Sequence, residues 1–200
     1  MKSTFFGRRA TKYDSGLEGY LSQPFYKLVL SSFQNRDSTA VLDVGCGTGA
    51  LLQLIDKHNN ITGYGIDAER NMVSVARKKL PHMKFVKARC EDMPFSAESF
   101  DAITVCMAFH HFSNRKGFAK EAARVLRKGG LLYIAELNLP ELVRTPLNLL
   151  FKTLGVNGKF FSAQEISSFF SRYGFSLRSV DSDRYAQVVV LCKNNSRNPR

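Results

Sequence analysis

"VLDVGCGTGA", residues 41–50, is an apolar run that ends in a glycine-rich turn. A turn of this composition, placed between a strand and a helix, lets a ligand approach the backbone and meet the helix N-terminus. The spacing Gly45-x-Gly47-x-Gly49 is typical of one class of enzyme. The spacing Gly45-x-Gly47-x-x-Ala50 in the same turn also satisfies the dinucleotide fingerprint. The turn alone therefore leaves the ligand open.

Short β-branched apolar runs alternate with helix-length segments on either side of this turn. Strands are expected at 40–45, 61–67, 83–88, 100–106 and 131–137, and helices near 50–58, 69–80 and 114–127. Gly129 and Gly130 are expected to close the last of these helices and start the next strand. Two further strands joined by a polar turn at 182–184 should pair antiparallel. The alternation predicts an α/β protein with a doubly wound, mostly parallel sheet and one reversed strand near the C-terminus.

Composition favours one compact unit of 200 residues with 44% apolar content. Residues 1–39 read as an N-terminal helical segment over a site, with a restart marked by Ser22 and Pro24; they could equally be core helices. Residues 40–193 read as the main domain, with 139–162 as a small helical cap insertion or further core, and 194–200 as a flexible tail.

Neither a membrane span nor a signal-peptide core is present in the pattern, which predicts a cytoplasmic protein. The four cysteines show no C-x-x-C spacing and no companion histidines, so neither a metal site nor a disulfide framework is indicated. The net charge of +12 permits attraction to RNA, acidic lipid or anionic substrates without demanding any of them.

Two aspartates at strand positions narrow the choice of ligand. Asp67 ends the second strand, 18 residues after Gly49, where an acid can accept hydrogen bonds from a ribose hydroxyl pair. Asp43 lies inside the first strand, where a carboxylate is costly to bury unless a positive or hydrogen-bonding group answers it. An ammonium group on the ligand would answer Asp43, directly or through water, whereas a pyrophosphate would be repelled.

Five stretches in order carry a resemblance to a known family: "VLDVGCGTG" at 41–49, "GYGID" at 63–67, "EDMPFSAESFDAITVCMAFHHF" at 91–112, "AARVLRKGGLLYIAE" at 122–136 and "FSAQEISSFFSRYGF" at 161–175. Over residues 40–192 the chain resembles the class I S-adenosylmethionine-dependent methyltransferases, within the type 11 small-molecule group that includes ubiquinone/menaquinone enzymes. The resemblance implies a Rossmann-like seven-stranded sheet, S-adenosylmethionine as cofactor and S-adenosylhomocysteine as product.

The sequence departs from the family pattern at two positions. Arg89 stands where an acid is usual, so the adenine amino group needs another acceptor, for which Glu91, Asp92 and the backbone at Cys90 are candidates. Lys128 replaces a proline in the turn before the fifth strand, which reads as a tolerated variant. The first departure bears on the adenine contacts and leaves the class of cofactor unchanged.

The resemblance also implies which residues hold the cofactor. The three glycines would approach its methionine and sugar parts, Asp67 its ribose, and Ala68 with Cys90 and Glu91 its adenine. Tyr13 either lies over the cofactor or anchors the first helix. Cys46, Cys90 and Cys106 fall near strand ends and should cluster around the cofactor. Small, weakly polar residues suit close-packed strand ends, so a packing role is favoured over redox control.

His110 and His111 follow the fourth strand and are the candidates for a general base, with an orienting structural role as the alternative. Methyl transfer is an in-line displacement that needs mostly alignment and exclusion of water, and only an alcohol or amine acceptor would profit from a base. Glu136, at the end of the fifth strand, could face the substrate, although a solvated carboxylate is the simpler interpretation.

The acceptor is predicted to be a small, partly apolar molecule. "FHHF" at 109–112 replaces the Asn-Pro-Pro-aromatic motif of many amino-group methyltransferases, and the apolar segment 142–161 could roof a pocket. An RNA or protein methyltransferase is the alternative that the charge supports, and a non-catalytic S-adenosylmethionine-binding protein is a third. The acceptor atom and the oligomeric state are left open by the sequence.

Overall fold

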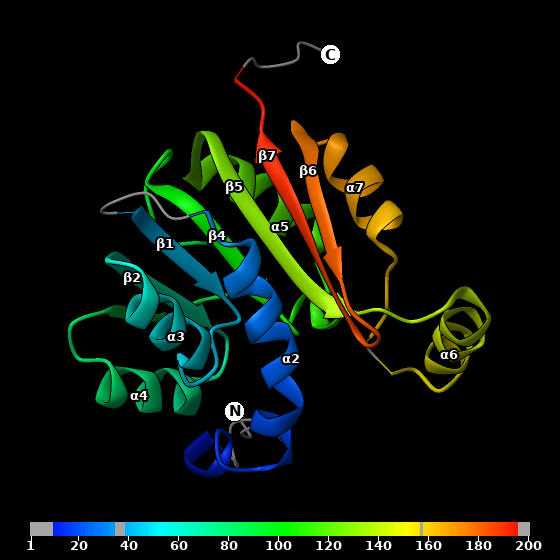
Figure 1. The fold of residues 1–200 in the computed structure, drawn as a ribbon, viewed down its shortest axis with the longest axis horizontal. Helices are drawn as coiled ribbons and strands as arrows, with labels where there is room; N and C mark the ends of the chain where they lie inside the picture. The colour runs from blue at the N-terminus through cyan, green and yellow to red at the C-terminus, as the bar shows by residue number, and fades with distance from the viewer. Residues whose placement is uncertain (1–9, 35–38, 157, 196–200) are drawn as a thin grey trace.

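A single seven-stranded sheet organises the described residues, 10–34, 39–156 and 158–195, of the computed structural model (Figure 1). Its strands are β1 (Thr39–Val44), β2 (Ile61–Asp67), β3 (Lys84–Lys87), β4 (Phe100–Cys106), β5 (Leu126–Leu137), β6 (Phe175–Ser182) and β7 (Ala186–Lys193). Their order in the sheet is β3-β2-β1-β4-β5-β7-β6. All neighbours pair parallel except β7, which is antiparallel to both β5 and β6. The predicted doubly wound sheet with one reversed strand is confirmed.

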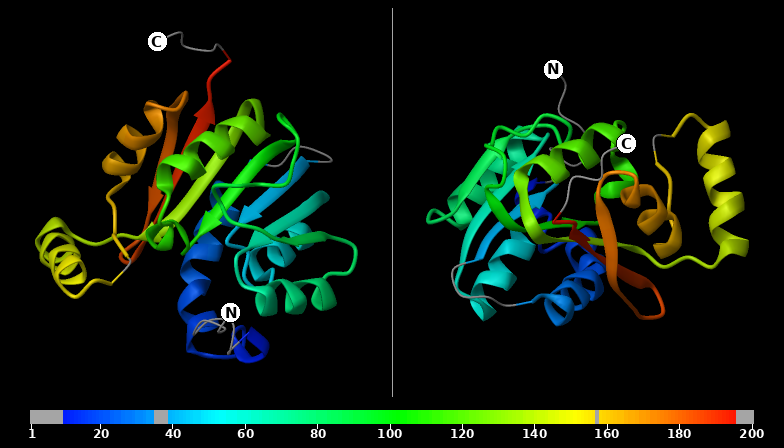
Figure 2. Two further views of the ribbon diagram at one scale, coloured as in Figure 1. Left: turned by 180° about the vertical axis from the view of Figure 1, so that it is seen from behind. Right: turned by 90° about the horizontal axis from the view of Figure 1, so that it is seen from above.

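Helices cover both faces of the sheet (Figures 1 and 2). The helices α2 (Leu17–Ser32), α3 (Ala50–His58) and α4 (Arg70–Lys79) pack on one face, and α5 (Arg115–Val125) and α7 (Ala163–Ser171) on the other. Successive strand residues point to opposite faces, so Val41 packs in the first core and Leu42 in the second. Both faces being covered explains why the central strands are almost continuously apolar.

The fifth strand begins earlier than the sequence pattern indicates. Helix α5 ends at Val125, and β5 starts at Leu126, so the expectation that Gly129 and Gly130 close the helix is wrong. Gly129 has a positive φ of 71° and lies where the pairing of β4 with β5 shifts register. A Cβ on Gly130 would lie 2.9 Å from the carbonyl oxygen of Asp101, so this glycine permits close approach of the two strands.

The predicted restart at Ser22 and Pro24 is also wrong, because α2 runs unbroken through Pro24. Proline inside a helix removes one backbone hydrogen bond. Burial of Phe25 and Val29 in the core under the sheet offsets this loss, since both are less than 4% exposed.

Helix α6 (Glu141–Thr153) stands out from the body of the protein (Figures 1 and 2). None of its residues is buried, and Leu142 is 91% exposed. Within the described ranges, every helix is too short or too polar to cross a membrane. Most of the predicted flexible tail, residues 196–200, lies outside the described residues.

Candidate active site

The glycine turn after β1 is shaped by left-handed backbone conformations. Gly45 and Gly47 have φ values of 77° and 52°, which residues other than glycine rarely adopt. A Cβ on Gly45 would lie 2.7 Å from the Cβ of Ala108, and a Cβ on Gly47 would meet no other atom within 4 Å. Gly45 therefore permits close packing against the turn after β4, whereas Gly47 leaves open space beside bare backbone.

Asp67 joins this turn to the end of β2. Its Oδ2 accepts a hydrogen bond from the backbone amide of Gly47 at 2.9 Å, and its Oδ1 accepts one from the amide of Glu69 at 2.8 Å. Burial raises the pKa of Asp67, while these two amide hydrogen bonds act against the rise. Each carboxylate oxygen keeps a further lone pair, so the group can still accept from a pair of hydroxyls.

One cavity of about 670 Å³ lies at the carboxyl ends of the central strands. It brings together eleven of the residues predicted for the site: Tyr13, Gly45, Cys46, Gly47, Asp67, Ala68, Cys90, Glu91, Cys106, His110 and His111. Its volume lies within the range of small-molecule sites, about 300–1,000 Å³.

Two residues predicted to bind the cofactor do not line the cavity. Gly49 is the N-cap of α3, and a Cβ there would lie 3.1 Å from the ring of Phe85, so this glycine serves the turn and its packing. Asp43 is buried in β1 and accepts a hydrogen bond from Thr104 Oγ1 at 2.7 Å. A neighbouring strand thus answers this carboxylate in part.

Asp14 is a residue that the sequence analysis missed. It accepts a hydrogen bond from Thr48 Oγ1 at 2.5 Å within the glycine turn, and it pairs with Lys79 of α4 at 2.7 Å. These contacts tie the N-terminal segment to the cavity wall. No local pattern marks Asp14, because its partners lie 34 and 65 residues away in the chain.

On the side of β3, Arg89 pairs with Glu91 at 2.6 Å. Burial acts to raise the pKa of Glu91, but hydrogen bonds from its backbone amide, from Arg89 and from Cys90 lower this pKa. Glu91 and Cys90 line the cavity and Asp92 does not, so the Glu91 carboxylate and the Cys90 backbone are the remaining candidate acceptors for an adenine amino group on this side.

Three of the four cysteines line the cavity, as the strand-end positions predict. Burial raises the pKa of Cys90 to about 12. The pKa values of Cys46 and Cys106 are raised well above the usual value, mainly by burial and secondarily by nearby carboxylates, which are Asp43 with Asp67 for Cys46 and Asp43 with Glu136 for Cys106. A thiol with a raised pKa is a poor nucleophile at neutral pH. This favours a packing role over redox control.

Ligand binding is expected to protect these three thiols from alkylation. At about ten times the Kd of an occupying ligand, labelling of Cys46, Cys90 and Cys106 should slow about tenfold, because only the free protein reacts. Cys192, which does not line the cavity, is the internal control. Mass spectrometry after iodoacetamide treatment with and without S-adenosylhomocysteine measures the rates. Equal labelling of Cys46, Cys90 and Cys106 with and without the ligand would contradict the prediction.

At the other end of the cavity, His110 forms a buried pair with Glu136. His110 Nδ1 and Glu136 Oε2 lie 2.7 Å apart, and the backbone amide of His110 donates to Glu136 Oε1 at 3.2 Å. Glu136 is only 1% exposed, so the interpretation of this residue as a solvated strand-end carboxylate is wrong. His111 is exposed and also lines the cavity.

The apolar segment 142–161 does not supply the roof that its composition predicts, since none of its described residues lines the cavity. Apolar side chains of the lining come instead from α2 and from the turn after β4, among them Leu21, Tyr26, Met107 and Phe112. Burial raises the pKa of Tyr26 well above its ordinary value, so its hydroxyl stays protonated.

A parallel sheet with a glycine turn where strand order reverses, and with an acid at the end of the next strand, is the arrangement of a fold that binds a nucleotide-type cofactor. Residues 42–134 match the family described as "Methyltransferase domain". Over these residues the chain is therefore similar to the S-adenosylmethionine-dependent methyltransferases that its sequence resembles.

Curated relatives support this assignment. A demethylmenaquinone methyltransferase from Thermotoga maritima is 34% identical over 145 residues, which are 70% of this chain and 62% of that protein. A ubiquinone/menaquinone biosynthesis C-methyltransferase from Campylobacter jejuni is 30% identical over 114 residues, 54% of this chain and 48% of that protein. The chain therefore spans about half to three-fifths of the length of these relatives.

Solved structures show the same fold. A SAM dependent methyltransferase from Aquifex aeolicus has a TM-score of 0.73 at 22% identity, covering 95% of this chain and all of that chain. A chain from the complex between the Haloferax volcanii Trm112 methyltransferase activator and a methyltransferase has a TM-score of 0.84 at 20% identity, covering 98% of this chain and all of that chain.

The residues of the cavity fit S-adenosylmethionine. Among the described residues, the charged side chains that line it are four carboxylates and one guanidinium: Glu18, Asp67, Glu69, Glu91 and Arg89. An acidic lining suits a ligand that carries a sulfonium and an ammonium group and opposes a pyrophosphate. The open space beside Gly47 and the free lone pairs of Asp67 are the features that a nucleoside needs.

Proposed function

We propose that this protein transfers the methyl group of S-adenosylmethionine to a small, partly apolar acceptor, and that the acceptor is a quinol-type ring. The observation that carries the proposal is one cavity lined by two chemically different kinds of group. Asp67 ends β2 and Glu91 follows β3, whereas Met107, His110 and Phe112 follow β4, and β1 lies between β2 and β4 in the sheet. The names of the two curated relatives point to a quinone ring as the acceptor.

The N-terminal segment covers the cavity in this proposal. Tyr13, Leu21 and Tyr26 line the cavity, and Asp14 holds the segment against the glycine turn. Excluding water from the site favours a displacement that depends mainly on alignment. Residues 1–9 and 35–38 of the predicted covering segment lie outside the described residues.

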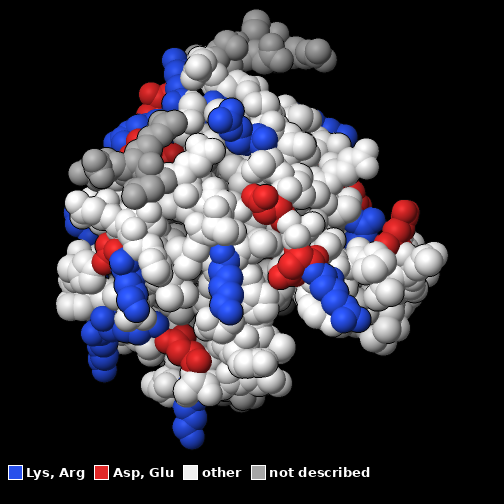
Figure 3. Space-filling view, in the orientation of Figure 1, with Lys and Arg blue, Asp and Glu red and all other residues white. Residues whose placement is uncertain are grey.

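An RNA or protein acceptor has less support. Several members of the basic run in α4 and β3 already have partners: Arg77 donates to the carbonyl of Phe85, and Lys79 and Arg89 pair with carboxylates. On the face seen in Figure 3, Lys and Arg are scattered with Asp and Glu between them and form no single basic patch. The acidic lining of the cavity also disfavours a phosphate backbone.

Radiolabelled methyl transfer tests the proposal. The full chain is incubated with labelled S-adenosylmethionine and either reduced 1,4-dihydroxynaphthalene, bulk tRNA or a basic protein, and binding of the cofactor is measured by calorimetry. We expect label in the naphthalene product, with the methyl group on ring carbon by NMR. Label only in tRNA or protein would replace the proposal with the alternative, and binding without transfer to any acceptor would favour a cofactor-binding protein.

A further inference from the structure

Glu136 and His110 form a buried acid–imidazole pair at the acceptor end of the cavity. Glu136 lies in β5 and His110 in the turn after β4, formed by η2 (Phe109–His111). In the described part of the chain, the Glu136 carboxylate forms two hydrogen bonds, both with His110. A buried carboxylate is costly unless its hydrogen bonds are satisfied, so its position here needs a reason.

The His110 backbone is held on both sides. Its amide donates to Glu136, and its carbonyl accepts from Arg115 Nη2 at 3.0 Å and from the amide of Lys159 at 3.2 Å. The ring lies against Phe160, with 5.2 Å between ring centroids. These contacts leave the imidazole little freedom to turn.

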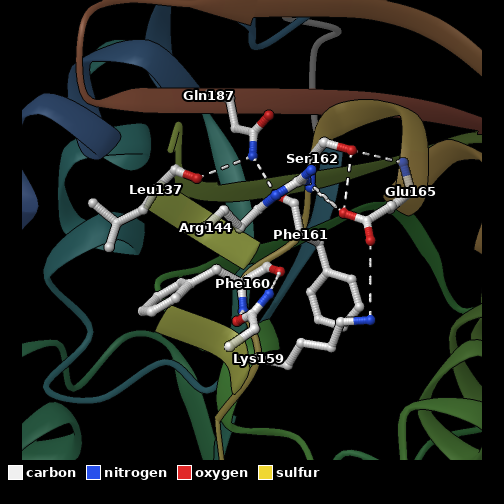
Figure 4. Close-up of polar contacts among 9 residues, drawn as sticks. Leu137, Arg144, Lys159, Phe160, Phe161, Ser162, Glu165 and Gln187 are labelled. Atoms are coloured by element: carbon white, nitrogen blue, oxygen red, sulfur yellow. Dashed lines mark hydrogen bonds and ion pairs between the residues drawn. The ribbon is translucent and has the colours of Figure 1, made fainter. Parts of the chain in front are cut away.

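The segment that packs on His110 is itself fixed to the sheet and to α6 (Figure 4). Gln187 of β7 donates to the carbonyls of Leu137 and Phe161, and Asn148 of α6 exchanges two hydrogen bonds with Phe160. Glu165 pairs with Arg144. The support around the imidazole therefore extends across three elements, which is what a preorganised site requires.

The tautomer of His110 depends on the ionisation of Glu136. The His110 backbone amide donates to Oε1, and an ionised carboxylate accepts at Oε2 as well. With Glu136 ionised, Nδ1 carries the ring proton and donates it to Oε2, which lies 2.7 Å away. The second ring nitrogen, Nε2, then keeps its lone pair.

The sheet order places this lone pair on the acceptor side. Asp67 follows β2, the glycine turn follows β1, His110 follows β4 and Glu136 ends β5, and these strands are neighbours in the order β2-β1-β4-β5. A cofactor with its ribose at Asp67 and its methionine part at the glycine turn points its far end toward β4. His110 lines the cavity there.

We infer that His110 Nε2 is the catalytic proton acceptor, that Glu136 is its positioning residue, and that the acceptor substrate carries an ionisable hydroxyl on its ring. The inference rests on the proposed function and deepens it, because a base is useful only if the acceptor loses a proton on methylation. The Glu136 carboxylate holds the imidazole in the reactive tautomer and stabilises the imidazolium that forms.

The proton and electron balance closes without a further reactant. When bound, S-adenosylmethionine supplies an activated methyl group, and the electron pair of the broken S–C bond stays on sulfur. Nε2 takes the hydroxyl proton as the ring carbon bonds to the methyl group. Enolisation then restores the hydroxyl from the ring-carbon proton, and His110 returns its proton to water, so one proton is released for each methyl transferred.

Substitution of His110 gives the first test. With 1,4-dihydroxynaphthalene, His110→Gln should lower kcat about 10²–10³-fold and remove the acidic limb of the pH profile, while the Kd of S-adenosylmethionine stays within about twofold. His58→Gln, on the exposed end of α3, is the matched control. The charged or titratable residues in contact with His110 are Glu136 from β5, His111 from η2, Arg115 from α5 and Lys159 from the segment before α7, so the profile is also measured for His111→Gln. A loss of rate and of the acidic limb in His111→Gln, with His110→Gln normal, would overturn the inference.

Glu136→Gln separates positioning from packing. The glutamine amide donates to Nδ1, which forces the ring proton onto Nε2, so kcat should fall at least tenfold although the shape is kept. Long-range ¹H–¹⁵N NMR of the full chain without cofactor should show the Nδ1–H tautomer of His110 in the native protein and the Nε2–H tautomer in the variant. A native Nε2–H tautomer would refute the inference whatever the activity. Absence of methyl transfer to any acceptor, with the Nδ1–H tautomer present, would count against the proposed function instead.

Discussion

Replacing Asp67 by asparagine is expected to weaken S-adenosylmethionine binding about 100-fold or more. A hydrogen bond to a charged group contributes about 1.5–3 kcal/mol, and the carboxylate is positioned to accept two of them from a ribose. The substitution also disturbs the turn, because asparagine would place an NH₂ group against the backbone amide of Gly47 or of Glu69, which now donate to the two oxygens. Calorimetric titration with S-adenosylmethionine measures the change.

The same substitution at a surface aspartate is the control. Asp56 lies on α3, pairs with His82 at 3.1 Å and does not line the cavity. Asp56→Asn should bind the cofactor like the native protein. If Asp67→Asn also binds within a few-fold of the native protein, then Asp67 does not hold the ribose.

The central part of the fold follows from local patterns. The ranges 50–58, 61–67 and 100–106, expected from periodicity and turn residues, are the bounds of α3, β2 and β4. The two strands are short and mostly apolar, so the change of period from 2 to 3.6 is sharp. The wrong expectations occur where distant contacts decide. Gly129 lies at a shift of register against β4, and Pro24 stays helical because its neighbours are buried under the sheet.

Composition was a poor guide to α6. Its leucines satisfy a helical apolar pattern, which ordinarily means burial, but they remain exposed beside the body of the protein. The helix contributes Arg144 (Figure 4) to the support of the segment 159–165. It also contributes Asn148, and this role depends on polar residues that the apolar pattern does not single out.

The candidate site was predictable as a set of strand ends but not as a network. Parallel strands bring their carboxyl ends to one edge, so Gly47, Asp67, Cys106 and His110 could be placed together from order alone. The burial of Glu136 could not, because it depends on pairing with a residue 26 positions earlier in the chain. Pairing across the sheet thus changes a strand-end carboxylate from a solvated group into a positioning residue.

Asp43→Asn is expected to remove most of a pH dependence of stability between about pH 4 and pH 7. Burial, opposed by the hydrogen bond from Thr104, raises the pKa of Asp43 from 3.8 to about 7. The folded protein therefore binds one more proton than the unfolded chain in this window, so the stabilisation is complete below about pH 4 and is lost as the pH rises to 7. The slope is about 1.4 kcal/mol per pH unit, or about 4 kcal/mol across the window.

Urea unfolding of both proteins at pH 5, 6, 7 and 8 tests this expectation, since the difference in free energy of unfolding isolates Asp43 from other titrating groups. The native protein should lose stability relative to Asp43→Asn from pH 5 to 7, and the difference should level off at pH 8. Asp181→Asn, at an exposed position of β6, should run parallel to the native protein. A constant difference between native and Asp43→Asn would mean that Asp43 is already ionised at pH 5. An ammonium group on the cofactor favours the ionised carboxylate of Asp43. If cofactor affinity rises up to pH 7 in the native protein and not in Asp43→Asn, this buried aspartate acts on the ligand.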